Sequence, residues 1–372
     1  MIIFLFIFIL LHFLISLFAD KIIPYQGFFA YPELLKNYDL PKFIYSLANF
    51  DGVYYLKIAK DGYQQFEQAF FPLFPLLIRW LTLVTKNYLL SGLVIVYLSF
   101  FTAFIFLKKL LQKNLKNYNY QSVIFFLLVF PTSFFFISVY TESLFFLFLI
   151  LFFYFFDQKK YFLSAVFGFF ASLTRINGVL LIIPFLTKFI IDLKNKKNRR
   201  DLLFYSLLPI IGMVIYMTYL YLSTGDFLAF LKAQPAFGAN RSVSPIFLPQ
   251  VYFRYLKILI TAKVNYQHFV ALMEILIFTF ALLVLFFDLQ KIAKRGGGAI
   301  FLGINLFSLA NLILPTLTGT FSSIPRYSLF SLSQFLFLGG IKNKVLKGTL
   351  LSVFSLLHFI FFIFYIQGYF IS

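Results

Sequence analysis

The sequence predicts an all-α integral membrane protein, folded as a polytopic bundle of about eleven transmembrane helices. Among its 372 residues, 61% are hydrophobic and 12% are charged. A soluble domain carries about 25% charged residues and has too little interior to bury so much apolar surface. The apolar runs are also continuous, whereas a transmembrane β-barrel alternates apolar and polar residues along each strand. Soluble folds are therefore excluded, and a β-barrel is not expected.

Eleven apolar segments run along the chain, although several are shorter than the ~20 residues that a straight span needs. They lie at residues 2–18, 88–107, 121–137, 141–156, 161–173, 178–192, 201–222, 267–288, 299–316, 326–341 and 347–367. The first segment has no basic residues ahead of it and no clear small-residue cleavage site. We therefore expect a retained helix and not a signal peptide.

The net charge of +19 predicts the orientation of these helices. In a soluble protein it would indicate nucleic-acid binding, but in a membrane protein Lys and Arg gather in the cytoplasmic loops. With the N-terminus inside, five cytoplasmic loops hold eighteen of the 32 Lys and Arg residues, beside four acidic ones. The eighteen are Lys108, Lys109, Lys113, Lys116, Lys159, Lys160, Lys188, Lys194, Lys196, Lys197, Arg199, Arg200, Lys291, Lys294, Arg295, Lys342, Lys344 and Lys347. Loops 19–87 and 223–245 then face outward, and we expect no nucleic-acid partner.

The first outer loop holds polar residues that apolar packing does not explain. From Tyr54 onward, the apolar spacing predicts an amphipathic helix lying in the membrane interface. Asp51 stands just before this helix, next to Gly52. It could cap the helix N-terminus, or it could act as a carboxylate general base at the membrane surface. The residues themselves favour neither role.

Two polar residues interrupt the apolar segments on the same outer side. Glu142 opens an apolar helix, where it could complement the helix dipole or serve a functional site. Arg175 lies alone between two apolar runs. An isolated Arg can extend to the interface, but the turn at Asn177 and Gly178 favours a fixed geometry.

The later outer regions add an acid and two arginines. Loop 223–245 contains Asp226 and Arg241. Arg326 lies at the start of a helix, where the dipole disfavours a cation, so we expect it to have an anionic partner. Arg175, Arg241 and Arg326 on one outer face suit a lipid-linked substrate that carries a phosphate, because a guanidinium donates paired hydrogen bonds to phosphate oxygens.

At these residues the chain resembles a known family. Residues 50–63 and 69–76 resemble the first outer loop of PIG-V-like mannosyltransferases. Short signatures of that family follow in the same order, at Tyr140-Thr141-Glu142-Ser143, Thr174-Arg175-Ile176-Asn177-Gly178, Gly225-Asp226 with Gln234 and Gly238, and Pro325-Arg326-Tyr327. Relatives usually have Trp before the Asp and a Trp-Tyr pair after it, where this chain has Phe50 and Tyr54-Tyr55. These changes keep the aromatic character of the loop.

The resemblance implies a glycosyltransferase of the GT-C superfamily, with residues 1–372 as one membrane domain. Residues 1–222 would form the core module, and residues 223–372 would add an outer loop and variable C-terminal helices. The implied reaction moves a sugar, identified by the family as mannose, from a polyprenyl or dolichyl phosphate to a hydroxyl acceptor, with inversion at the anomeric carbon. The acceptor would be a glycan, a glycolipid or a protein.

The resemblance also implies roles for particular residues. Asp51 would be the catalytic base, and the substrate-binding residues would be Arg175, Arg326, Arg241, Glu142, Asp226, Tyr63 and Asp61. A lipid monophosphate needs no clamp for a diphosphate, so we expect no metal and no cofactor. The carboxylates of Asp61 and Glu67 leave one alternative open, which is that they bind a metal ion. The active site would face the extracytoplasmic side, in the plasma membrane of a prokaryote or the endoplasmic reticulum of a eukaryote.

Two other functional hypotheses remain open. A transporter or flippase of lipid-linked sugars would need ionisable residues at the bilayer midplane, and Glu274 is the main candidate. A structural subunit of a membrane complex would not need an outward cluster of one acid and three arginines.

Overall fold

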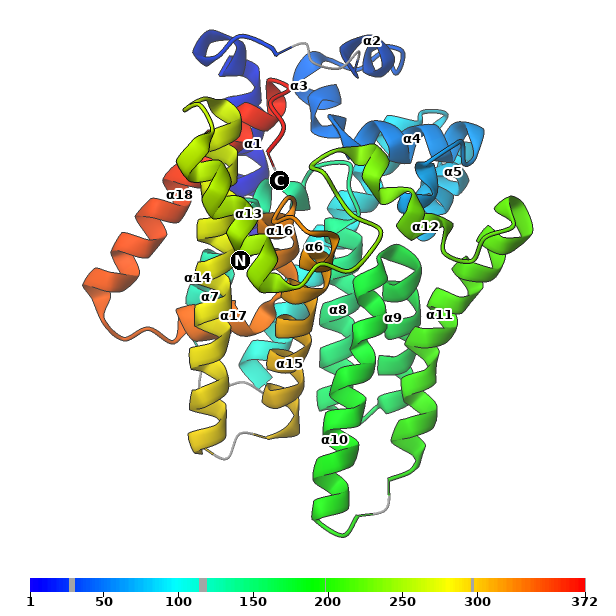
Figure 1. Cartoon of the computed structure of the whole chain (residues 1–372), viewed down its shortest axis with the longest axis vertical. Helices are drawn as coiled ribbons and strands as arrows, with labels where there is room; N and C mark the ends of the chain where they lie inside the picture. The colour runs from blue at the N-terminus through cyan, green and yellow to red at the C-terminus, as the bar shows by residue number, and fades with distance from the viewer. Residues whose placement is uncertain (27–30, 114–118, 198, 296–297, 372) are drawn as a thin grey trace.

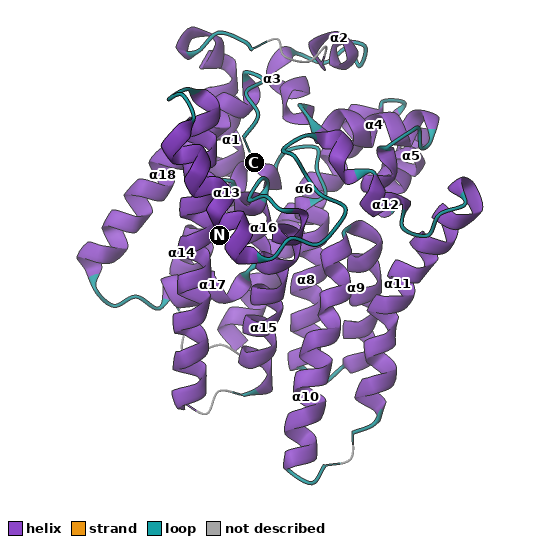
Figure 2. Ribbon diagram, viewed as in Figure 1, coloured by secondary structure: helices purple, strands orange, loops and turns teal. Residues whose placement is uncertain are grey.

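The computed structural model describes residues 1–26, 31–113, 119–197, 199–295 and 298–371. Within these ranges the fold is built of helices and contains no strand, as Figure 2 shows. The prediction of a polytopic all-α membrane protein is confirmed, because seven helical segments of these ranges are long and apolar enough to cross a membrane. They are α1 (Ile2–Ile22), α6 (Tyr88–Lys113), η4 (Ile176–Leu181) with α10 (Ile182–Lys194), α11 (Asp201–Thr224), α14 (Tyr266–Arg295), α15 (Ala299–Ile313) with η6 (Leu314–Thr318), and α18 (Lys344–Ile366).

Other apolar segments form shorter helices than the sequence indicates. They are α7 (Tyr120–Val129), α8 (Glu142–Asp157), α9 (Tyr161–Thr174) and α17 (Leu332–Gly339). The expected segment 121–137 is interrupted near Pro131, because proline has no backbone N–H to extend the helix, and it resumes as η3 (Ser133–Phe136). The expected segment 326–341 is divided into α16 (Ile324–Tyr327), η7 (Ser328–Phe330) and α17. The count of eleven membrane spans stays a prediction.

Close helix packing at glycine holds the centre of the bundle together. Helices α6, α8, α9 and α11 are neighbours, and α9 packs closely on α11 (Figure 1). A Cβ on Gly212 would lie 2.6 Å from the carbonyl oxygen of Phe169, and a Cβ on Gly168 would lie 2.8 Å from Pro209 Cγ. Small residues allow such close approach, which supplies packing energy in a lipid environment where apolar burial between helices contributes little.

The remaining helices lie toward one end of the molecule, drawn at the top in Figure 1. They are α2 (Tyr31–Lys36), α3 (Lys42–Tyr45), α4 (Asp51–Asp61), α5 (Leu73–Thr85), α12 (Ala229–Lys232) and α13 (Leu248–Thr261). The C-terminal ends of α10 and α14, which carry Lys194, Lys291 and Lys294, lie at the opposite end. These basic helix ends are thus separated from the long loops expected outside; Lys116 falls outside the described residues.

Helix α13 was not expected from the sequence. Its exposed apolar residues Phe253, Leu256 and Ile260 recur at spacings of three and four, so they share one face. Val251 and Tyr255 are buried on another face, where α13 packs against α14. The helix has 14 residues, which is too short for a hydropathy window to identify as a span.

Candidate active site

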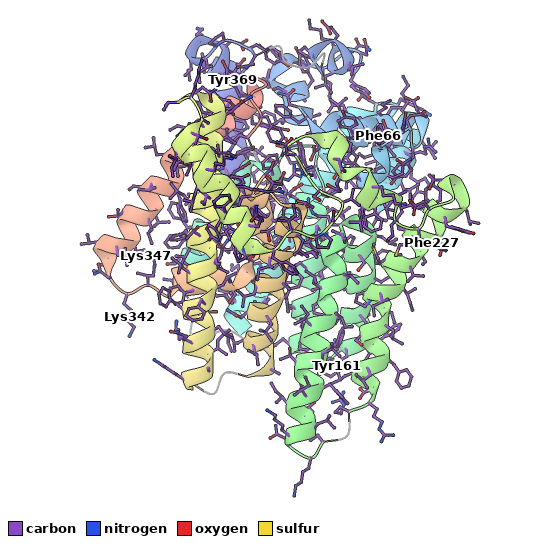
Figure 3. All side chains as sticks on the ribbon, viewed as in Figure 1. Phe66, Tyr161, Phe227, Lys342, Lys347 and Tyr369 are labelled. Carbon is purple, nitrogen blue, oxygen red and sulfur yellow. The ribbon has the colours of Figure 1, made fainter. Side chains whose placement is uncertain are left out.

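A large cavity opens among the helices of the end that carries α4 and α12. Its volume is about 1620 Å³. The wall is built from separate parts of the chain: the start of α4, the turn after α9, the loop that follows α12, helices α13 and α14, the loop before α16, and residues 368–370. Figure 3 shows Tyr369 of this wall at the upper end, together with Phe66 of the first long loop, and Tyr161 toward the opposite end.

Asp51 reaches this cavity because of the turn that precedes α4. Phe50 adopts a φ of 59°, a left-handed conformation that costs a non-glycine residue about 1–3 kcal/mol. The surrounding contacts hold that turn in place. The Tyr140 hydroxyl donates to the carbonyl oxygen of Asn49 over 2.8 Å and accepts from the backbone N–H of Asp51 over 3.2 Å. The Asn49 side chain in turn donates to the carbonyl oxygen of Tyr365 over 2.9 Å, at the end of α18.

Asp51 does not cap the helix. It is the first residue of α4, Phe50 occupies the N-cap position, and no side chain makes a capping hydrogen bond there. The Asp51 carboxylate instead accepts a hydrogen bond at Oδ2 from Arg326 Nη1 over 2.7 Å. Its side chain is 24% exposed and lines the cavity. The capping role considered for Asp51 is therefore not observed, and its role as a general base stays a prediction.

Arg326 belongs to a four-membered ionic network. Its Nε lies 3.0 Å from Glu142 Oε1, and the same oxygen lies 2.7 Å from Arg175 Nη1. Arg175 Nη1 also donates to Thr141 Oγ1 over 2.9 Å. Glu142 is 0% exposed, so it supports both guanidinium groups from behind the cavity wall. The anionic partner expected for Arg326 exists, and it consists of the carboxylates of the chain itself.

Aromatic rings cover the two guanidinium groups of the network. The Arg326 guanidinium lies 5.2 Å from the ring centroid of Tyr140, and the Arg175 guanidinium lies 4.6 Å from that of Tyr327. Rings at these distances attract the cations and exclude water, which strengthens the ion pairs. Burial raises the pKa of the Tyr140 phenol well above its ordinary value, so its hydroxyl stays protonated and continues to donate to Asn49.

Glycine and asparagine place Arg175. A Cβ on Gly178 would lie 2.2 Å from the backbone nitrogen of Ser172, so only glycine fits where η4 folds back on α9. Asn177 Nδ2 donates to Asn311 Oδ1 over 2.8 Å, which fixes this turn to α15. The Asn177-Gly178 turn thus holds Arg175 in a fixed position, as the sequence predicted.

The structure brings five of the eight predicted site residues to one place. Asp51, Arg175, Arg241 and Arg326 line the cavity, and Glu142 lies directly behind it. The other three, Tyr63, Asp61 and Asp226, are not part of the cavity wall. Tyr63 donates to the carbonyl oxygen of Phe70 over 2.7 Å, Asp226 pairs with Lys232 at 2.7 Å, and Asp61 is exposed at the end of α4. A substrate role for these three stays a prediction.

Several wall residues were missed in the sequence. Arg254, Tyr255 and Lys257 lie on α13 and line the cavity. Glu274, which the sequence indicated only under the transporter hypothesis, also lines the cavity, and its Oε2 accepts from the Tyr255 hydroxyl over 2.6 Å. The amphipathic spacing of residues 248–261, with Pro249 in the first turn, was the available signal for this helix. Glu67, one of the two carboxylates considered as metal ligands in the sequence, is buried and pairs with Lys57 at 2.9 Å.

Comparison with known proteins identifies the family. The family model described as Mannosyltransferase (PIG-V) matches residues 1–232. The chain belongs to this family. It is a glycosyltransferase, and the PIG-V resemblance noted in the sequence is confirmed. No curated protein matches the chain. The matched region contains Asp51, Glu142 and Arg175, while Arg326 and Arg241 lie beyond it.

Proposed function

We propose that the chain transfers a mannosyl unit from a polyprenyl or dolichyl phosphate to a hydroxyl group of a glycan, glycolipid or protein acceptor, with inversion at the anomeric carbon. The observation that carries the proposal is the position of Asp51. It is a carboxylate on the wall of a large cavity, held by Arg326 through one oxygen only. Membership of the mannosyltransferase (PIG-V) family supports the choice of sugar.

Asp51 would act as the general base. Arg326 occupies Oδ2, and no described residue donates a hydrogen bond to Oδ1, which is available to an acceptor hydroxyl. Tyr54 and Tyr55 line the same cavity wall, where Tyr54 is stacked on Phe70 and Tyr55 is buried. A positioned base of this kind contributes about 10²–10⁴ to the rate.

The proposal treats residues 1–372 as one domain. The wall of the cavity includes residues from both sides of residue 222, and the base in the first part is held by Arg326 in the second. The core module 1–222 would therefore need residues 223–372 to complete the site. We also propose that the site faces the extracytoplasmic side, because it lies at the end opposite the basic C-terminal ends of α10 and α14.

The test uses purified protein in detergent with radiolabelled polyprenyl phosphate mannose and, in parallel, radiolabelled GDP-mannose. A detergent extract of host membranes supplies the acceptors. We expect label to move to the acceptor fraction from the lipid donor alone, and NMR of the product to give an anomeric configuration opposite to that of the donor. Transfer from GDP-mannose without lipid donor would overturn the donor assignment. A transporter of lipid-linked sugar would consume no donor in this assay.

A further inference from the structure

The cavity carries more positive charge than its own carboxylates balance. Asp51 and Glu142 lie against Arg326 and Arg175, so these four side chains have no net charge as a group. Three more cations line the same cavity: Arg241, Arg254 and Lys257. No carboxylate of the described residues lies within ion-pair distance of these three. We call them the second cation cluster.

One further carboxylate on the wall does not cancel this charge. Glu274 is buried, and the Tyr255 hydroxyl donates to its Oε2 over 2.6 Å. Even if Glu274 is fully ionised, it offsets one of the three positive charges. The remaining surplus fits a phosphate ester, and it fits still better the phosphate monoester that forms when a sugar departs and leaves an additional negative charge on the phosphate.

The two arginines of the cluster are fixed by the loop that connects η6 to α16. Arg254 Nη1 donates to the carbonyl oxygen of Gly319 over 3.2 Å, and Arg241 Nη2 donates to Ser323 Oγ over 3.3 Å. Gly319 has a φ of +86°, and a Cβ there would lie 2.6 Å from Arg254 Nη1. Each contact uses one of the five N–H donors of a guanidinium, so most donors remain for a ligand.

The same loop places the second cation cluster close to the ionic network. The carbonyl oxygen of Ser323 accepts from the backbone N–H of Arg326 over 3.1 Å, so Arg326 follows Ser323 by one tight turn. Arg326, in turn, holds Asp51. Ser323, which contacts Arg241, and Arg326, which holds the base, are therefore only three residues apart within one turn.

We propose that Arg241, Arg254 and Lys257 bind the phosphate of the lipid-linked donor. The inference rests on the proposed function. If Asp51 accepts the proton of the acceptor, Arg326, 2.7 Å from it, lies on the acceptor side of the anomeric carbon. Inversion places the leaving phosphate on the opposite side. The phosphate therefore needs a separate set of cations, and the second cation cluster supplies it.

The step then balances without a further reactant. The acceptor oxygen forms a bond to the anomeric carbon, and its proton passes to Asp51. The bond from the anomeric carbon to the phosphate oxygen breaks, and its electron pair stays on the phosphate. The second cation cluster receives that added negative charge, which stabilises the transition state more than the bound donor.

Binding of undecaprenyl phosphate to the purified full-length protein tests this assignment without any transfer reaction. Uncharged undecaprenol, inorganic phosphate and phosphatidylglycerol are measured beside it. We expect Arg254→Gln and Arg241→Gln each to weaken undecaprenyl phosphate binding about tenfold or more, as loss of a charged hydrogen bond predicts. Lys257→Gln should weaken it about threefold, because Lys257 is exposed and contributes less. Binding of undecaprenol should not change.

Lys263→Gln is the matched control, because Lys263 follows α13 at the same end, is exposed, and is not part of the cavity wall.

Wild-type affinity in the Arg254 and Lys257 variants would overturn the assignment, as would competition by inorganic phosphate or phosphatidylglycerol as strong as that of undecaprenyl phosphate. If an arginine variant melts at a lower temperature than the wild type, Lys257→Gln decides, since the Lys257 side chain makes no hydrogen bond or ion pair with the described residues. If the protein binds the lipid phosphate through this cluster but transfers no sugar, only the proposed function is refuted. If it transfers sugar but the cluster variants bind the lipid phosphate as the wild type does, only the role of the cluster is refuted.

Discussion

Asp51 and Arg326 are joined by an ion pair of 2.7 Å although 275 positions separate them in the chain. Asp51 opens α4 in the first long loop, and Arg326 lies in the short helix α16 near the C-terminal end of the fold. Glu142 and Arg175 extend the pair into a network that involves four separate segments. The base is therefore positioned by the complete fold and not by its own loop.

The sharpest prediction concerns Asp51→Asn. Asn keeps the size of the side chain and can still accept a hydrogen bond from Arg326, but it cannot take a proton from the acceptor. We expect normal membrane insertion and a loss of transfer activity of about 10² or more, because a general base is removed. Initial rates with radiolabelled polyprenyl phosphate mannose measure the effect.

Asp39→Asn provides the control for that variant. Asp39 is exposed in the same long loop and has a φ of 55°, a conformation that Asn tolerates well. Its activity should equal that of the wild type. If Asp51→Asn also transferred sugar at the wild-type rate, Asp51 would keep only a structural role.

Arg326→Lys should impair activity although the charge is retained. The guanidinium contacts Asp51 through Nη1 and Glu142 through Nε, and an ammonium group cannot reproduce this fork. We expect kcat to fall at least tenfold, because the base loses its orientation. Arg199→Lys, in a surface pair with Asp201 outside the cavity, should leave kcat unchanged. Equal kcat values in both variants would show that the fork does not position the base.

Gly178→Ala tests the turn that places Arg175. The added methyl group would lie 2.2 Å from the backbone nitrogen of Ser172, and backbone cannot move aside as a flexible side chain does. We expect a lower melting temperature in detergent and a loss of activity. Gly348→Ala is the opposite case, since nothing lies within 4 Å of its Cβ. In the helix α18 it should be neutral or stabilise by up to about 1 kcal/mol. Equal melting temperatures for the two variants would contradict the predicted clash.

The orientation of the chain can be tested with topology reporters. The basic loops predict a cytoplasmic signal from fusions after Lys116, Arg200 and Arg295. Fusions after Gln65 and Gly238 should give an external signal, because both follow segments at the end that carries the cavity. Opposite signals at two or more of these sites would reverse the orientation and place the active site in the cytoplasm.

Hydropathy and charge in the sequence are sufficient to determine the class of this protein. Both are local properties, so a window of neighbouring residues reveals long helices such as α14 and α6, and short motifs around Asp51, Glu142 and Arg175 indicate the family. The same locality explains what was missed. Helix α13 combines an apolar face with Arg254 and Lys257, so its average hydropathy is low and no window identifies it as a span.

The tertiary structure alone decided which charges meet. The sequence predicts that Arg326 needs an anionic partner, but the partner could have been a substrate phosphate, and the fold provides Asp51 and Glu142 instead. The choice depends on how α4, α8 and α16 pack together, and packing between segments far apart in the chain leaves no local pattern in the residues. A buried carboxylate such as Glu142 must be compensated by cations that the fold brings to it, because leaving it unpaired in a low-dielectric interior costs several kcal/mol. Of the cations on the cavity wall, this packing left Arg241, Arg254 and Lys257 without a carboxylate partner among the described residues.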